Sequence, residues 1–363
     1  MSADVDVAVV GAGAIGTAIA WRLAQRGQRV LLIDRLAPGQ EASGAAAGIL
    51  SAQVEAEVPG PFLDLLLAAE NAYPALMNEL GAADEVGYRR DGVLKLALDE
   101  SEFLALEAQR ELQRSLGLVV EAWSVAQLAR AEPGLSGSLA GANFFPGGGR
   151  VDNRLLVAAL LRAALRAGVE LLSAEVVGLA RASDRVTGIV TAGGLRRAGQ
   201  VVVAAGAWAS QLQHVGLEAS AIVPVRGQVL RFPVPTVSRV VFGAGGYLVP
   251  RAGGVLVGST TERVGFRKEV TVEGRAALHA RAVRLCPALA GASVEAAWAG
   301  LRPATADGLP ALGPTPLPGL HLAVGLLRNG ILLTPLASDW VALGVLGEAA
   351  ALPAPFRAAR LFR

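Results

Sequence analysis

The chain of 363 residues contains a single cysteine, Cys286, and only two lysines, Lys95 and Lys268. One thiol excludes an internal disulfide and a cysteine-based metal cluster, so we expect no metal centre and a reducing, cytoplasmic environment. Arginine carries most of the positive charge, and the net charge is only +2 although the pI is about 9.0. Since no long block of like charges accompanies this balance, we expect no nucleic-acid partner.

The sequence also lacks the patterns of a secretory signal and of a membrane-spanning helix. No basic region precedes the first apolar run, Val5–Val10. The segment Gly308–Leu327 has no acidic residue, lysine or arginine, but it contains four prolines, which a spanning helix does not tolerate. We therefore expect a soluble cytoplasmic protein with no membrane partner.

Small and apolar residues are abundant instead. The chain is 53% hydrophobic and contains 44 glycines and 19 prolines. This composition is typical of a compact α/β protein that is rich in turns. The length allows a large core and predicts a division into two domains.

The N-terminus carries the most informative motif. The apolar run Val5–Val10 leads directly into Gly11-Ala12-Gly13-Ala14-Ile15-Gly16, which is followed by a helical pattern over Thr17–Arg26. A second apolar run, Val30–Ile33, ends at Asp34. Strand, glycine turn, helix, strand and acid in this order predict a dinucleotide-binding βαβ unit.

Each glycine of the turn has a physical role in such a unit. Gly11 permits the tight turn, Gly13 lets the backbone approach a pyrophosphate, and Gly16 lets the helix pack on the strand. The helix N-terminus then directs its N–H groups at the phosphates, and Asp34 can accept hydrogen bonds from ribose hydroxyls. The sequence therefore predicts a bound dinucleotide.

The rest of the chain alternates between two kinds of pattern. Helical periodicity covers Pro61–Leu80, Ser101–Leu116, Asp152–Ala167 and Ile331–Leu346, the last with Pro335 near its start. Strand-like runs cover Glu170–Leu172, Val176–Ala180, Arg185–Val190, Val201–Ala205 and Ser293–Leu301. Shorter strands with turns between them, typical of an antiparallel sheet, cover Val229–Phe232, Val240–Phe242, Tyr247–Val249 and Val255–Val257.

These patterns predict an α/β protein in which two domains are interleaved. A Rossmann-like cofactor domain is expected from residues 1–80, 150–221 and 295–363. A smaller α+β substrate domain, built on an antiparallel sheet, is expected from residues 81–149 and 222–294.

Five further segments carry a resemblance to a known family. Ala42–Leu50, Val203–Trp208 and Gly325–Leu332 are similar to its flavin-contacting segments, whereas Trp298–Pro310 and Gly245–Arg251 are similar to its carboxylate-binding segments. The chain resembles the D-amino-acid oxidase-like family of FAD-dependent oxidoreductases over nearly its whole length, and within it the glycine oxidases of the thiamine pathway.

The resemblance implies a noncovalent FAD and a set of residues that hold it. The implied cofactor-binding residues are Gly11, Gly13, Ala14, Ile15, Gly16, Asp34, Arg35, Ala42, Ser43, Ala47, Gly48, Ile49, Val176, Ala205, Trp208, Arg328, Asn329, Gly330, Ile331 and Leu332. It also implies three catalytic residues. Arg302 grips the carboxylate of an amino acid, Tyr247 binds it from the opposite side, and Arg328 projects toward the substrate or the cavity mouth.

The departures from the family pattern bear on specificity. Asp34 stands where glutamate is commoner, which on that residue alone leaves FAD and NAD both open. Thr260-Thr261 stands where some glycine oxidases present a methionine to the substrate. Cys286 lies before Arg302, so we expect no covalent link to the flavin, and we assign no role to His214 or His279.

The resemblance implies oxidative deamination of glycine or a small amino acid, with hydride transfer from Cα to flavin N5. Oxygen is reduced to hydrogen peroxide, and the imine hydrolyses to glyoxylate and ammonia or feeds thiazole synthesis. The alternatives are an oxidase or dehydrogenase of D-amino acids, sarcosine or D-proline, a flavoprotein acting on modified tRNA, and a non-catalytic flavin-binding role. The resemblance also implies a homo-oligomer, namely a tetramer.

Overall fold

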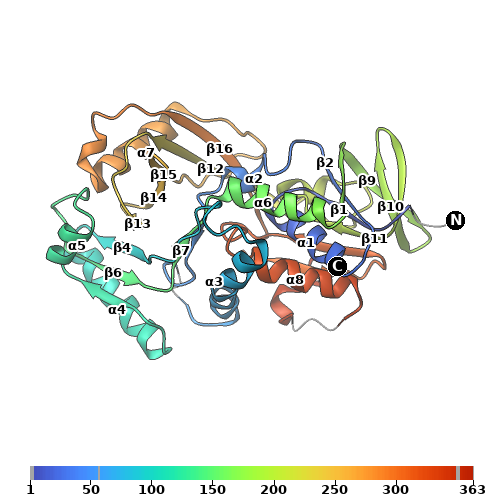
Figure 1. Ribbon diagram of the computed structural model, residues 1–363, viewed down its shortest axis with the longest axis horizontal. Coiled ribbons are helices and arrows are strands. Elements are labelled where there is room, and N and C mark those ends of the chain that lie inside the picture. The colour runs from blue at the N-terminus through green and yellow to red at the C-terminus, as the bar shows by residue number, and fades with distance from the viewer. Residues whose placement is uncertain (1–3, 56–57, 349–351, 363) are drawn as a thin grey trace.

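Two eight-stranded sheets organise the computed structural model, which describes residues 4–55, 58–348 and 352–362. Figure 1 shows one sheet with β1, β2 and β9–β11 on the right and the other with β4, β6 and β12–β16 on the left. The helices α1, α2 and α6 lie between these two groups in the same view. The α/β fold class expected from the sequence is confirmed.

The first sheet contains the predicted βαβ unit. Its strand order is β17 (Ala311–Pro314), β18 (Leu320–Val324), β11 (Gly194–Val203), β1 (Val5–Val10), β2 (Val30–Asp34) and β8 (Glu170–Ser173), extended from β11 by β10 (Arg185–Thr191) and β9 (Val176–Ala182). The five strands from β18 to β8 run parallel. Their carboxyl ends therefore meet at one edge, where ligands of such sheets bind.

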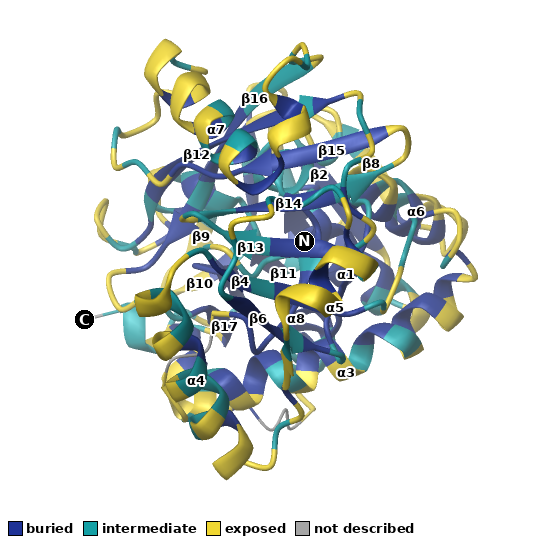
Figure 2. Ribbon diagram, turned by 90° about the vertical axis from the view of Figure 1, so that its left-hand side faces the viewer, coloured by how far each residue is buried: buried dark blue, intermediate teal, exposed yellow. Residues whose placement is uncertain are grey.

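The two faces of this sheet are covered by different elements. Val7 and Val9 of β1 pack with α1 (Ala14–Gln25), α3 (Pro61–Leu80), α6 (Asn153–Arg166) and α8 (Thr334–Val345) in one buried cluster. Ala8 and Val10 face the opposite side and pack with β9 and β10. This alternation follows from the two-residue period of a strand. Figure 2 shows the same division, with dark blue buried strands inside helices that have yellow exposed faces.

The second sheet is mainly antiparallel. Its order is β16 (Ala296–Ala304), β12 (Val223–Phe232), β15 (Gly254–Gly258), β14 (Gly246–Arg251), β13 (Val240–Gly243), β4 (Val93–Ala97), β6 (Gly141–Phe145) and β5 (Glu121–Trp123), and only β13 and β4 pair in parallel. The remaining elements are α2 (Ala42–Ala45), α4 (Glu100–Ser115), α5 (Val125–Ala131), α7 (Val272–Leu285), the small pair β3 (Ile49–Leu50) and β7 (Gly149–Arg150), and the short 3₁₀ turns Gly206–Gln211, Pro287–Leu289, Ala354–Phe356 and Ala358–Leu361.

Two differences between the expected and the observed elements concern the C-terminal part of the chain. The strand near Ser293–Leu301 is present as β16, and it pairs with β12 in the second sheet. The C-terminal helix begins at Thr334 rather than Ile331, with Pro335 in its first turn. Proline has no N–H to donate, so the first turn is where a helix accepts it.

No helix within the described part of the chain combines the length and the apolar character that crossing a membrane requires. Among the same residues, no group of histidine, cysteine, aspartate and glutamate side chains is arranged to hold a metal ion.

Candidate functional site

Two adjoining cavities lie at the carboxyl ends of the parallel strands. The strand-end cavity, of about 330 Å³, is bordered by the ends of β1, β2 and β11. The inter-sheet cavity, of about 170 Å³, is bordered by the start of α1, by the loop around Ala42–Ser51 and by strands of the second sheet. They share Gly13, Ala42, Ser43, Ala204 and Gly206 in their walls. Gly13 of the glycine turn therefore lies where the two cavities adjoin.

The glycine turn leaves no room for side chains. A Cβ on Gly11, whose φ is +109°, would lie 2.4 Å from the carbonyl oxygen of Ala204. A Cβ on Gly16 would lie 1.9 Å from the carbonyl oxygen of Gly11, and one on Gly13 would lie 2.9 Å from Ser43 Oγ. The turn therefore presents backbone without side chains where the two cavities adjoin, as a binding site for a pyrophosphate requires. The residues present fit a dinucleotide.

The expected ribose and adenine contacts gather around the strand-end cavity. Asp34, Arg35, Val176, Ala205 and Trp208 all line it. The guanidinium of Arg35 stacks over the Trp208 ring at 4.4 Å from its centroid. One carboxylate oxygen of Asp34 accepts a hydrogen bond from Ala12 N at 2.7 Å, which ties the acid to the glycine turn. The other accepts from Leu36 N at 2.9 Å.

The loop expected to cross the flavin lines the inter-sheet cavity. Ala47, Gly48 and Ile49 belong to its wall, together with Ile15 and Gly16 of α1. Gly48 has a φ of +65°, and a Cβ there would lie 1.9 Å from the carbonyl oxygen of Val151. Only glycine therefore fits this position in the folded chain.

Ala14 is the one expected cofactor residue that lines neither cavity. Its side chain is buried, and its N–H donates to Ser43 Oγ at 3.0 Å. Ser43 thus accepts one of the first N–H groups of α1, which have no partner within the helix itself. Ala14 therefore acts on the site through the placement of Ser43.

Arg302 and Tyr247 meet in the wall of the inter-sheet cavity. Arg302, on β16, donates to Ser259 Oγ at 2.7 Å and to the carbonyl oxygen of Thr260 at 3.2 Å. A Cβ on Gly227 would lie 2.2 Å from Arg302 Nη2, so the guanidinium lies directly over the backbone of β12. Burial lowers the pKa of Arg302, and a hydrogen bond with Tyr247 opposes that shift.

Ser259 is a cavity residue that the sequence interpretation missed. The departure noted in the sequence concerned Thr260-Thr261, but Thr260 does not line the cavity and its Oγ1 accepts from Gln228 N at 2.9 Å. Thr261 is exposed, whereas Ser259 lines the cavity and is 6% exposed. Ser259 and Thr260 both follow the end of β15 at Gly258, and of the two only Ser259 lines the cavity.

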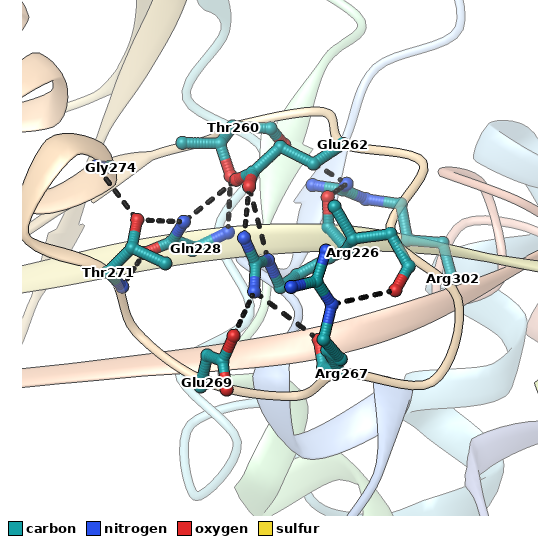
Figure 3. A network of polar contacts seen from close by, with 10 residues as sticks. Arg226, Gln228, Thr260, Glu262, Arg267, Glu269, Thr271, Gly274 and Arg302 are labelled. Atoms are coloured by element: carbon teal, nitrogen blue, oxygen red, sulfur yellow. Dashed lines mark hydrogen bonds and ion pairs between the residues drawn. The ribbon is translucent and has the colours of Figure 1, made fainter.

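A network of polar contacts with residues of β12 holds the Ser259–Thr260 segment in place. Figure 3 shows Arg226 and Gln228 of β12 directed toward Glu262, and Arg302 beside them. Arg226, 4% exposed, is paired with Glu262, and their backbones form an antiparallel bridge. Burial alone would raise the pKa of Glu262, but hydrogen bonds with Thr260, Arg226 and Gln228 outweigh it and lower that pKa.

The turn around Arg328 closes the remaining side. Residues Arg328, Asn329, Gly330, Ile331 and Leu332 all line the inter-sheet cavity. Arg328 pairs with Glu55 at 3.3 Å, and both also border an outer cavity of about 700 Å³. Arg328 therefore lies where the inter-sheet cavity adjoins the outer cavity.

Cys286 is buried among the residues that pack α7 on the second sheet, and it lines neither the strand-end nor the inter-sheet cavity. His214 and His279 are also absent from both walls.

Comparison with known proteins agrees with this geometry. Residues 6–343 match the model of the family described as FAD dependent oxidoreductase. The chain is 39% identical to the glycine oxidase of Geobacillus kaustophilus over 93% of its own length and 92% of the relative. A crystal structure of glycine oxidase from that organism has 38% identity and a TM-score of 0.92, with 98% of each chain covered.

Another relative is longer than this chain. The bifunctional protein ThiO/ThiG of Synechocystis sp. is 36% identical over 93% of this chain, which spans only 51% of that protein. The family match covers most of the sequence, and the site has the glycine turn and the two adjoining cavities that a dinucleotide needs. The chain therefore belongs to the family of FAD-dependent oxidoreductases.

Proposed function

We propose that this protein oxidises glycine with FAD and oxygen. The observation that carries the proposal is the guanidinium of Arg302 in the wall of the inter-sheet cavity. Among the described residues its hydrogen bonds involve carbonyl oxygens and the hydroxyls of Ser259 and Tyr247, and no acidic side chain forms an ion pair with it. A guanidinium withdrawn from water favours an anionic partner, and a planar carboxylate matches its fork.

We assign the clamping of the substrate carboxylate to Arg302 and Tyr247. The phenol of Tyr247 is 8% exposed and lines the same cavity. Holding the carboxylate at two points orients the Cα–H bond, which converts an encounter in solution into a positioned reaction. Arg328, at the mouth, is proposed to attract the incoming anion.

The cavity limits what fits and which protonation state reacts. Its volume is about 170 Å³ before a cofactor is bound, and its wall includes Val229, Phe242 and Leu326. Apolar walls disfavour a charged ammonium, so they favour the neutral amine that can give up a hydride. A small amino acid such as glycine is the substrate that we therefore propose.

The cofactor contacts are proposed to be the residues that line the two cavities, with Asp34 at the ribose and the Gly11–Gly16 turn at the pyrophosphate. FAD supplies a two-electron acceptor that oxygen regenerates. In the overall balance, glycine, water and oxygen give glyoxylate, ammonia and hydrogen peroxide. We propose noncovalent binding, because Cys286 lies outside both cavities.

The remaining parts of the proposal concern the setting of the reaction. We propose a cytoplasmic homo-oligomer, on the basis of the family resemblance and of a buried single thiol. The relative named as bifunctional ThiO/ThiG supports the further proposal that the imine or its product serves thiazole synthesis.

The test is anaerobic reduction of the bound flavin by a panel of glycine, sarcosine, D-alanine and D-proline. We expect glycine to bleach the flavin and air to restore it with release of peroxide. The Arg302→Ala variant should keep its FAD but lose turnover, with a cost of about 2–5 kcal/mol in kcat/KM. Undiminished turnover of the variant at low glycine would contradict the assigned role.

A further inference from the structure

The hydroxyl of Ser259 is a polar group that the carboxylate clamp leaves unused. Ser259 is 6% exposed and lines the inter-sheet cavity, next to Arg302 and Tyr247. A serine hydroxyl has one hydrogen to donate and two lone pairs that accept. Its Oγ accepts from Arg302 Nη2 at 2.7 Å, and among the described residues nothing accepts its hydrogen.

Contacts on both sides of Ser259 hold its backbone in place, so its hydroxyl stays in the cavity wall beside Arg302. The carbonyl oxygen of Ser259 accepts from Arg281 at 3.3 Å. The next residue, Thr260, is anchored to β12 through its hydroxyl and Gln228 N. Figure 3 shows the network that continues from Thr260 to Glu262 and Arg226 behind this segment.

Three donors therefore converge on one part of the cavity. Tyr247 lies opposite Gly258 in the pairing of β14 and β15, and a Cβ on Gly258 would lie 2.4 Å from the Tyr247 hydroxyl oxygen. Ser259 follows Gly258, and its Oγ is bonded to the guanidinium of Arg302. A carboxylate offers about four lone-pair sites, so it can accept from all three groups together.

We propose that Ser259 donates a hydrogen bond to the substrate carboxylate, as a third member of the clamp. The inference rests on the proposed function, because it assumes that Arg302 and Tyr247 bind that carboxylate. The donation gives a partner to a buried donor that otherwise has none, which is the condition under which a hydrogen bond contributes most to binding. Because the serine hydroxyl is neutral, this hydrogen bond favours ligands with an acceptor oxygen at that place and adds no further positive charge to the cavity.

The experiment uses the FAD-loaded enzyme and two probes, glycine as substrate and acetate as a carboxylate that cannot be oxidised. The Kd of acetate is measured from the change that it causes in the flavin absorbance, and KM and kcat from glycine turnover. For Ser259→Ala we expect both the acetate Kd and the glycine KM to rise about tenfold, with kcat and FAD content unchanged.

Two control variants separate this role from a general effect on folding. Thr261→Ala removes an exposed hydroxyl two residues away, and both constants should stay at the wild-type values. Ser259→Thr retains a hydroxyl and should restore most of the acetate affinity. Acetate and glycine constants in Ser259→Ala that equal those of the wild type would overturn the proposal.

A double-mutant cycle separates direct donation from an effect through Arg302. If Ser259 contacts the carboxylate itself, Ser259→Ala should weaken acetate binding further in the Arg302→Lys background. If it does not, Ser259 acts only by orienting Arg302, and direct donation is refuted. If glycine fails to reduce the flavin while acetate still binds in a Ser259-dependent way, the proposed substrate is wrong but the clamp stands.

Discussion

Acid should destabilise this protein through a buried histidine that lines none of the three cavities. His321, on β18, is 5% exposed, and its Nε2 lies 2.7 Å from Gln200 Oε1. Gln200 donates its amide hydrogen to the carbonyl oxygen of Val345, so Oε1 is the acceptor that faces the imidazole. Nε2 therefore carries the hydrogen of the neutral ring. Nδ1 has no hydrogen-bond partner among the described residues, so a proton added there would be buried without an acceptor.

The magnitude follows from the difference in pKa between the folded and unfolded chains. Burial lowers the pKa of His321 from 6.5 to about 4. The unfolded chain thus takes up a proton below pH 6.5, whereas the folded chain does not do so until about pH 4. The stabilising contribution is complete above pH 6.5 and is lost as the pH falls toward 4. By linkage, about 2 kcal/mol of unfolding free energy is lost at pH 5.

The assay is urea unfolding at pH 7.5 and pH 5 with FAD held at the same excess, so that ligand stabilisation is matched. Other groups also titrate in this range, and a comparison of variants isolates the histidine. His321→Leu should reduce the loss of unfolding free energy at pH 5 by about 2 kcal/mol relative to wild type. His214→Asn, at an exposed position with φ of +62°, serves as the control and should keep the full loss. A pH dependence in His321→Leu as steep as that of the wild type would refute the assignment.

Two substitutions test the support of the cavity walls. Tyr73→Phe removes a buried hydroxyl that donates to the carbonyl oxygen of Ile331 at 2.5 Å, so FAD titration of the apoprotein should show roughly five- to tenfold weaker binding. The control is Tyr88→Phe, because the Tyr88 ring is stacked on that of Tyr73 with centroids 6.0 Å apart. This variant should bind FAD as the wild type does. Equal FAD affinities of the wild type and both variants would contradict this account. Gly300→Ala would place a Cβ 2.4 Å from the nearest side chain of α2, so we expect a lower Tm and less bound FAD on purification. The control is Gly291→Ala, whose added Cβ would have no atom within 4 Å, and it should change neither the Tm nor the FAD content. An unchanged Tm and FAD content in Gly300→Ala would contradict the prediction, because the neighbouring residues would then have moved to accept the methyl group.

The cofactor half of the site could be predicted from the sequence because its signals are local. The turn Gly11–Gly16 and Asp34 lie within one βαβ unit, and the steric need for each glycine follows from that unit alone. The same holds for α6, predicted over Asp152–Ala167, where Asp152 is the N-cap and accepts hydrogen bonds from Arg154 N and Leu155 N. Neighbours in the chain supply the partners in each of these cases.

The substrate half could be predicted only in part, because its contacts depend on strand register. Arg302 and Tyr247 were found through a family motif, but the pairing of Arg226 with Glu262 spans 36 positions and no local pattern marks it. The choice between Ser259 and Thr260 depends on which of two neighbouring residues faces the cavity. The membership of β16 in the second sheet likewise depends on its pairing with β12, which composition does not reveal.

The loop from Ala42 to Ile49 determines how the two halves of the site fit together. From the side of the first sheet, Asn153 donates to the carbonyl oxygen of Ser43 at 2.6 Å. From the side of the second sheet, Trp298 Nε1 donates to the carbonyl oxygen of Ala45 at 3.1 Å, and Arg251 donates to that of Ala47 at 2.7 Å.

Burial lowers the pKa of Arg251 to about 10, which still leaves it charged at neutral pH, so its hydrogen bonds to this loop are charge-assisted. In the proposed function, elements of the first sheet hold the cofactor and those of the second clamp the amino acid, and this loop is hydrogen-bonded to residues on both sides. Transfer of a hydride depends steeply on the distance between donor and acceptor. We therefore expect the hydrogen bonds that the carbonyl oxygens of Ala45 and Ala47 accept to fix that distance, although neither side chain takes part in the reaction.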